Sequence, residues 1–359
     1  MRFLGGSVLS VGSVTTFQSE APLHPAAAEF LGDAFARGWA DPSKIHQESR
    51  KVALVLNEAK EVYCQHLGLR HDQINFLGEP SLGFHLGISG LIEAESTFYH
   101  SAVDRSEVFA VASGVRSKVL PVDITGQYVA PTGTVVDVIT YQAVNGETGI
   151  PGVSPNGFAG KVFVEASPLI SLPKKWNSAL WDARSWNGPA GLGILAIADK
   201  GWVNPLPHND SRVTPGSFSA PLAIAGAIAL ENYIRDFNEH ESKIRALNAK
   251  IRNFLITQLE DVDIAGDLET ALPHLLSFSL LYVDAQLLVD ELDKSGYAVD
   301  SGSACNSMNM QPSHVLAALG LLTHGNVRMS LRADHTDMEI EKFLSVLKDL
   351  VTKIRREWS

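Results

Sequence analysis

Residues 301–307 (SGSACNS) place a cysteine, Cys305, among serine, glycine and alanine. Small neighbours leave a thiol open to solvent, and a helix that begins shortly after it would favour the thiolate, the reactive form. This pattern indicates a nucleophilic cysteine. Free cysteines are more often buried structural residues, so composition alone leaves both interpretations open.

The composition of the 359-residue chain excludes several classes of protein. Hydrophobic residues make up 45% and charged residues 19%, which predicts a large core and excludes a disordered chain. The net charge of −11 argues against a nucleic-acid binder. The longest apolar run, residues 222–230, is too short to span a membrane. With only two cysteines, Cys64 and Cys305, there is no disulfide framework, and we predict a cytoplasmic protein.

Short apolar runs alternate with longer helical patterns over the first two thirds of the chain. Runs that are apolar almost throughout favour strands buried on both faces, as in a parallel sheet covered by helices. We predict strands at 74–76, 108–113, 135–144, 161–166 and 193–198, and helices at 46–67 and about 85–95. This order predicts a large α/β domain.

The last third has a different pattern, which predicts a smaller α+β domain. We expect one or two long helices over 219–260, strands at 275–283, 297–302 and 327–332, and helices at 285–296, 312–320 and 335–358. The spacing of Thr336 and Glu339 is that of a capping box. We assign residues 15–240 to the large domain, and residues 1–14 with 241–359, including the Cys305 loop, to the small one.

The stretch at 301–321 (SGSACNSMNMQPSHVLAALGL), followed by VRMSL at 327–331, resembles the cysteine desulfurases of the aminotransferase class V superfamily. Those enzymes carry Ser-Ser-Gly-Ser-Ala-Cys, a Pro-Ser-x-Val-Leu-x-Ala-Leu-Gly helix and an Arg-x-Ser-x strand. Four further segments resemble family motifs in the same order: 41–50, 144–150, 163–168 and 187–195. The resemblance implies the fold-type I aminotransferase architecture, in which a large domain holds a mainly parallel, seven-stranded sheet and a smaller α+β domain follows.

The resemblance also implies a cofactor and a mechanism. Family members bind pyridoxal phosphate in the large domain of a homodimer, and a loop cysteine takes sulfur from the cysteine–cofactor adduct as a persulfide. By position, Cys305 falls on that cysteine, Arg328 on the arginine that binds the substrate carboxylate, and His100 on the histidine that stacks on the cofactor ring. For His100, an ordinary buried polar residue is an equally good interpretation.

The Schiff-base lysine of the family is absent from its expected position. The motif Ser-Gly-His-Lys aligns with residues 182–185, so Arg184 stands at the histidine and Ser185 at the lysine. A hydroxyl cannot form an imine with an aldehyde. Lys174 and Lys175 lie ten residues upstream, on a predicted solvated loop.

The segment that would hold the cofactor's phosphate is also altered. The family's Ser-Gly-Ala-Thr-Glu turn, which holds phosphate through backbone amides, aligns with residues 78–82 (GEPSL). Pro80 removes one amide donor, and Glu79 places a carboxylate near the expected dianion. Ser81 keeps a donor at this turn.

Three other positions complete the candidate cofactor site. Glu165 replaces the aspartate that faces the pyridine nitrogen, and Pro168 replaces the glutamine that follows it. Asn145 keeps the first asparagine of the family's Asn-Asn-Glu motif. Ser217 resembles the threonine that reaches the phosphate of the neighbouring subunit, which favours a homodimer.

Three hypotheses follow from these residues. In the first, the chain keeps the desulfurase fold without normal pyridoxal-phosphate catalysis and handles sulfur through Cys305. In the second, it is an active pyridoxal-phosphate enzyme with unusual cofactor binding. In the third, it is a non-enzymatic partner or regulator of an intact homologous desulfurase. The expected partners are a second copy of the chain and a sulfur acceptor or homologous desulfurase, with no nucleic acid and no membrane.

Overall fold

A computed structural model describes residues 14–19, 21–198, 201–207, 213–214, 218–302 and 312–357. Cys305 and Ser217 lie outside the described residues. The chain divides into two compact units. The larger unit contains Glu20–Asn145 and Pro151–Asn238, and the smaller contains Gly146–Ile150, Glu239–Ser359 and Met1–Ser19, each as far as described.

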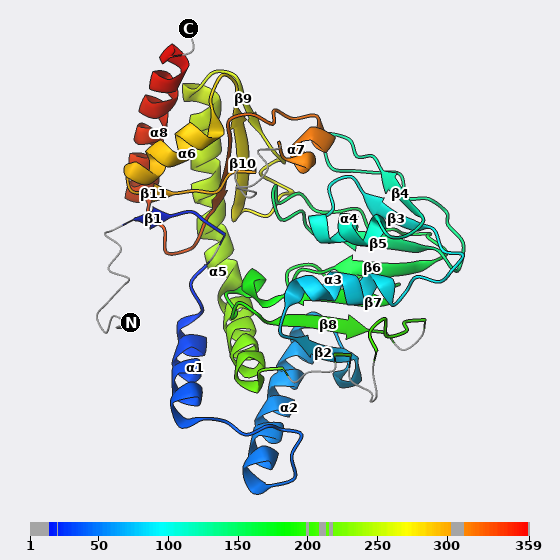
Figure 1. The fold of residues 1–359 in the computed structure, drawn as a ribbon. Coiled ribbons are helices and arrows are strands. Elements are labelled where there is room, and N and C mark those ends of the chain that lie inside the picture. The colour runs from blue at the N-terminus through cyan, green and yellow to red at the C-terminus, as the bar shows by residue number, and fades with distance from the viewer. Residues whose placement is uncertain are drawn as a thin grey trace, which may run out of the picture. The chain divides into compact units, whose positions relative to one another are not determined.

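The described part of the larger unit contains a seven-stranded sheet (Figure 1). In spatial order its strands are β2 (Ile74–Leu77), β8 (Gly193–Ile197), β7 (Ser178–Asp182), β6 (Lys161–Glu165), β5 (Val138–Gln142), β3 (Phe98–Ser101) and β4 (Ser117–Leu120). Strands β7, β6, β5, β3 and β4 pair in parallel, whereas β8 is antiparallel to both β7 and β2. The predicted α/β fold with a mainly parallel seven-stranded sheet is confirmed.

Helices cover both faces of this sheet. On one face, α2 (Gln47–Leu67) packs in the same core as Trp181 of β7, together with α1 (Pro25–Arg37) and the first half of α5 (Ala220–Gln258). On the other, α3 (Pro80–Ser89) and α4 (Ser106–Ala112) share a core with Leu180. Neighbouring strand residues point to opposite faces, so Trp181 faces α2 and Leu180 faces α3. A Cβ on Gly83 of α3 would lie 2.3 Å from Leu180 Cδ1, so a larger residue there would force the Leu180 side chain to move.

The smaller unit is an antiparallel sheet packed against helices. Its strands lie in the order β12 (Asn326–Ser330), β10 (Leu275–Leu280), β9 (Val262–Ile264). The helices are the second half of α5, α6 (Ala285–Lys294), α7 (His314–Leu319) and α8 (Asp337–Glu357). The predicted capping box of α8 is confirmed: Thr336 N donates to Glu339 Oε2 at 2.8 Å, and Glu339 N donates to Thr336 Oγ1 at 3.2 Å. Strand β1 (Thr15–Thr16) pairs in parallel with β11 (Tyr297–Ala298), so residues 15–16 go with this unit.

Several predicted elements were wrong or missing. The run at 108–113 forms helix α4 instead of a strand, because a short apolar run does not distinguish a buried strand from one helical turn. The strands β3 and β4 lie on either side of it in sequence, and β7 was missed because its apolar run is only three residues long. Helix α3 begins at Pro80 rather than near residue 85, since proline suits the first helical position.

The remaining long elements lie close to their predicted ranges. Helix α2 begins one residue after the predicted start and ends at the predicted Leu67. The segment 219–260 forms the single helix α5. Among the described residues, none of the helices is both long and apolar enough to cross a membrane.

Candidate functional site

The carboxyl ends of β3, β5 and β6 bring four polar side chains into one continuous chain of contacts. Arg105 Nε donates to Glu165 Oε1, and Gln142 Nε2 donates to Glu165 Oε2 at 2.8 Å. Gln142 Oε1 accepts from Asn145 Nδ2 at 3.0 Å, and the same amide donates to Val103 O at 3.0 Å. Parallel strands end at the same edge of a sheet, which is why residues 60 positions apart in sequence meet here.

Both oxygens of Glu165 are therefore engaged within the chain. The Glu165 side chain is 14% exposed. Its negative charge stabilises the protonated guanidinium of Arg105 and is the main reason that the pKa of Arg105 is raised. A carboxylate that faces a pyridine nitrogen would have to be free to pair with it. Here the carboxylate is paired with a guanidinium that the sequence analysis did not identify.

Ser185 and Arg184 lie just past the carboxyl end of β7, in a short 3-10 helix, Ala183–Trp186. The Arg184 guanidinium donates to Asp182 Oδ2 through Nη2 at 2.7 Å and through Nε at 3.0 Å, and Nε is also 3.2 Å from Oδ1. Ser185 Oγ donates to the backbone oxygen of Asp182 at 2.8 Å. Both side chains bond back to Asp182, and both residues are exposed.

The two lysines nearest in sequence lie at the other end of the sheet. Lys175 Nζ donates to Phe158 O at 3.1 Å and to Ala159 O at 2.5 Å, just before the amino end of β6. Glu165 is at the carboxyl end of that strand, six residues beyond Ala159 and thus about 20 Å from it at the usual rise per residue. Lys174 is exposed on the same loop. Lys175 thus contacts the segment before the amino end of β6, whereas Glu165 lies at the carboxyl end of that strand.

The amino end of α3 is already occupied by a carboxylate. Glu79 is the residue that caps this helix, and its Oε1 accepts from Ser81 N at 3.0 Å. Pro80 has no amide hydrogen, and Leu82 N donates to Glu79 O at 3.2 Å. The first three residues of α3 thus offer no free backbone donor to a phosphate.

His100 of β3 is packed among aromatic rings. Its ring stacks on Phe98 with centroids 5.6 Å apart and meets the edge of Phe109 at 4.8 Å. The residue is 1% exposed, and burial lowers its pKa, which favours the neutral imidazole. These contacts are those of a buried polar residue in a core.

Asp104 is a buried carboxyl that the sequence analysis did not identify. It is 2% exposed, and its Oδ2 accepts from Ser101 N at 2.8 Å and from Thr140 Oγ1 at 2.5 Å. Burial raises its pKa to about 7, and the nearby Glu165 adds to the rise. The adjacent charged residues Asp104 and Arg105 were the available signal, but no strand was predicted before them.

In the smaller unit, Arg328 of β12 lies beside an internal carboxylate. Arg328 Nη2 is 3.4 Å from Asp300 Oδ2, and their backbones exchange hydrogen bonds of 2.8 and 3.0 Å. Asp300 stands where the family motif Ser-Ser-Gly-Ser-Ala-Cys has its first serine. The arginine expected to bind a substrate carboxylate thus contacts a carboxylate of its own chain.

The ends of the segment that contains Cys305 are well anchored. On one side, Gly302 N donates to Asn326 Oδ1 at 2.8 Å. On the other, Ser313 caps α7 by accepting from Leu316 N at 3.2 Å. Gly320 ends α7 with the left-handed backbone that glycine favours.

Comparison with known proteins agrees with this architecture. Residues 185–343 match the aminotransferase class-V family. The cysteine desulfurase IscS of Dictyoglomus turgidum is 26% identical over 94% of each chain, and the cysteine desulfurase NifS of Azotobacter vinelandii is 25% identical over 89% of this chain and 88% of its own. A solved NifS-like protein superposes with a TM-score of 0.83 at 20% identity, covering 95% of this chain and all of its own. The apo cysteine desulfurase of Thermococcus onnurineus NA1 has a TM-score of 0.78 at 18% identity over 95% of both chains.

The chain thus has the fold of these solved structures, and residues 185–343 are similar to class-V aminotransferases. Over nearly its whole length it is similar to cysteine desulfurases, at about one quarter sequence identity. Enzymes of this family use pyridoxal phosphate. The family match begins at Ser185, so it does not include the start of α3 or Glu165.

Proposed function

We propose that this chain is a desulfurase-like protein that does not carry out the pyridoxal-phosphate reaction and that handles sulfur through Cys305. One observation carries the first part: the groups at the positions of the cofactor site are bonded to one another. Arg105 pairs with Glu165, Arg184 pairs with Asp182, and Glu79 caps α3. The two cations in this set are paired with carboxylates of the chain, and the Glu79 carboxylate lies at the start of α3.

The residues present do not fit pyridoxal phosphate. The aldehyde needs an amine, and Ser185 offers an exposed hydroxyl. The phosphate needs free amides at the start of a helix, and Glu79 takes the amide of Ser81. The pyridine nitrogen needs a free carboxylate, and Glu165 is held by Arg105 and Gln142. Three independent requirements of one ligand are unmet.

The second part of the proposal rests on the sequence around Cys305. A thiolate there would attack the outer sulfur of a low-molecular-weight persulfide, R–S–SH. A new sulfur–sulfur bond forms to Cys305, the sulfur–sulfur bond of the donor breaks, and the donor leaves as the thiolate RS⁻. The proton stays on the transferred sulfur, so charge and electrons balance without an added oxidant. Such a transfer needs only a reactive, accessible thiol.

Incubation with glutathione persulfide tests this function. Cofactor-free protein should gain one sulfur on Cys305, seen by mass spectrometry of its peptide, and lose it on treatment with dithiothreitol. Cys305→Ser is the matched control, and Cys64 is the internal one. If Cys305 stays unmodified, sulfur handling is wrong. If it is modified only when free cysteine and pyridoxal phosphate are both supplied, the chain is a conventional desulfurase.

A further inference from the structure

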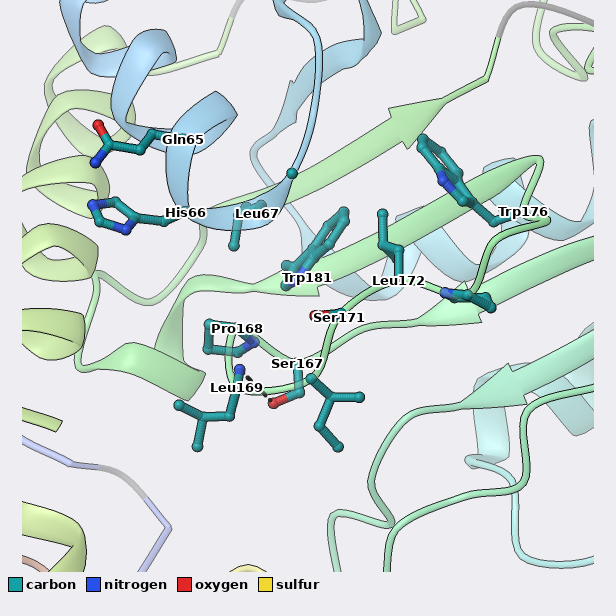
Figure 2. Close-up of a pocket in the computed structure, with 13 residues that line it drawn as sticks. Gln65, His66, Leu67, Ser167, Pro168, Leu169, Ser171, Leu172, Trp176 and Trp181 are labelled. Carbon is teal, nitrogen blue, oxygen red and sulfur yellow. Dashed lines mark hydrogen bonds between the residues drawn. The ribbon is translucent and has the colours of Figure 1, made fainter. Parts of the chain in front are cut away.

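A cavity of about 440 Å³ lies on the α2 face of the sheet in the larger unit (Figure 2). It is bounded by the carboxyl end of α2, by the loop at 166–177 that joins β6 to β7, and by Trp181 of β7. Trp181 shares a core with α2, whereas Leu180 shares one with α3. The cavity and the start of α3 therefore lie on opposite faces of the sheet.

Trp181 supplies a buried donor without an acceptor. The residue is 1% exposed, and its indole Nε1 has no hydrogen-bond partner within the part of the chain that is described. Two other buried or half-buried tryptophans are satisfied: Trp186 Nε1 donates to Gly226 O and Trp202 Nε1 donates to Leu86 O, both at 2.9 Å. Buried indole N–H groups normally find a partner. The unpaired donor of Trp181 indicates a ligand.

The lining defines the chemistry of that ligand. Figure 2 shows Trp181 between Leu67 and Leu172, with Trp176 beyond Leu172. None of the thirteen described lining residues is Asp, Glu, Lys or Arg. A carboxylate would lack a cation to offset its desolvation, so an uncharged ligand is favoured. Gln65, His66, Ser167 and Ser171 add polar groups to the aliphatic and aromatic part of the wall. Apolar walls with a few polar groups are typical of sites for small molecules.

We propose that this cavity binds a small, uncharged aromatic molecule with a carbonyl acceptor, such as an aromatic carboxamide. The Trp181 indole donates to the carbonyl oxygen, and the ring lies against Leu67, Leu172 and Trp176. The volume is within the range of sites that enclose drug-sized ligands. The proposal does not depend on the state of the cofactor site or of Cys305.

Benzamide is the probe. Benzoate is the control that carries a charge, and toluene is the control that has no hydrogen-bond acceptor. Indole N–H resonances of the ¹⁵N-labelled protein are followed during titration, and the Trp181 peak is assigned as the one missing in Trp181→Phe. Benzamide should move the Trp181 proton downfield in a saturable way, whereas benzoate and toluene should move it little. Trp181→Phe should weaken benzamide binding about fivefold to tenfold, the usual worth of one hydrogen bond. Trp39→Phe, outside the cavity, should bind like wild type.

A second variant keeps the test valid if Trp181→Phe does not fold. Leu172→Trp leaves Trp181 in place and fills the cavity, so it should abolish benzamide binding. The proposal is overturned if saturating benzamide leaves every indole resonance unmoved, if toluene shifts the Trp181 proton equally, or if Leu172→Trp binds benzamide as wild type does.

Discussion

Ser185→Lys combined with Glu79→Ala separates the two defects that we assign to the cofactor site. The lysine restores an amine, and the alanine removes the carboxylate at the start of α3. The Glu79 Oε1 atom accepts from Ser81 N at 3.0 Å. A phosphate oxygen that accepted from the same amide would lie within about 4 Å of that carboxylate. Two unit charges at that distance repel by about 4 kcal/mol at an effective dielectric constant near 20. Because Glu79 is exposed and screened, we expect Glu79→Ala to tighten binding by roughly tenfold to a hundredfold.

The assay is a titration with pyridoxal phosphate followed by visible absorbance, then borohydride reduction and mass spectrometry of the peptide that contains residue 185. Ser185→Lys alone should bind weakly and show no desulfurase turnover. The double variant should bind more tightly, and Ser185→Lys with Glu29→Ala, a change at an exposed glutamate of α1, should match the single variant. If Ser185→Lys alone gave tight binding and turnover, our account of the phosphate segment would be refuted. Equal affinity of the single and double variants would refute the role of Glu79.

Three further predictions concern the thiols, a buried acid and the assembly. Cys305 should alkylate faster than Cys64 in native protein, since Cys64 lies half-buried in α2 and burial raises its pKa; equal labelling in timed mass spectrometry would contradict this. The Asp104 carboxyl has a pKa of about 7 in the folded state and near 4 in the unfolded state. Between these two pH values the folded protein holds a proton that the unfolded chain has lost, so the contribution of Asp104 to stability falls as the pH rises from about 4 to 7. Asp104→Asn should therefore have a higher free energy of unfolding than wild type at pH 8, by up to about 4 kcal/mol, and the difference should be smaller at pH 5. If urea denaturation gave the same pH dependence of stability for both proteins, this role of Asp104 would be wrong. Finally, we expect a homodimer, because Ser217 resembles the threonine that reaches the phosphate of the neighbouring subunit; a clean monomer in sedimentation at micromolar concentration would exclude it.

Much of the fold could be predicted because its long elements carry strong patterns. Helices α2 and α8 have apolar residues at helical spacing, and β5, β6 and β8 are continuous apolar runs. The failures were short elements such as α4, for which a single turn of apolar residues carries no distinguishing period.

Residues of the candidate site could be predicted only where the sequence resembles a family motif. Ser185, Glu79 and Glu165 were located by resemblance, and their positions raised the question of the cofactor. Their partners could not be found in this way, because Arg105 meets Glu165 only through the parallel pairing of β3, β5 and β6. Whether the Trp181 indole N–H has a hydrogen-bond partner likewise depends on the position of the loop at 166–177, which no local sequence pattern specifies.

The absorbance spectrum of the wild-type protein, before and after addition of pyridoxal phosphate, tests the central claim most directly. We predict a colourless protein with no aldimine band in either state, and no lysine modified by the cofactor after borohydride reduction. A yellow protein whose band disappears on reduction, with the cofactor then found on a lysine, would contradict the account.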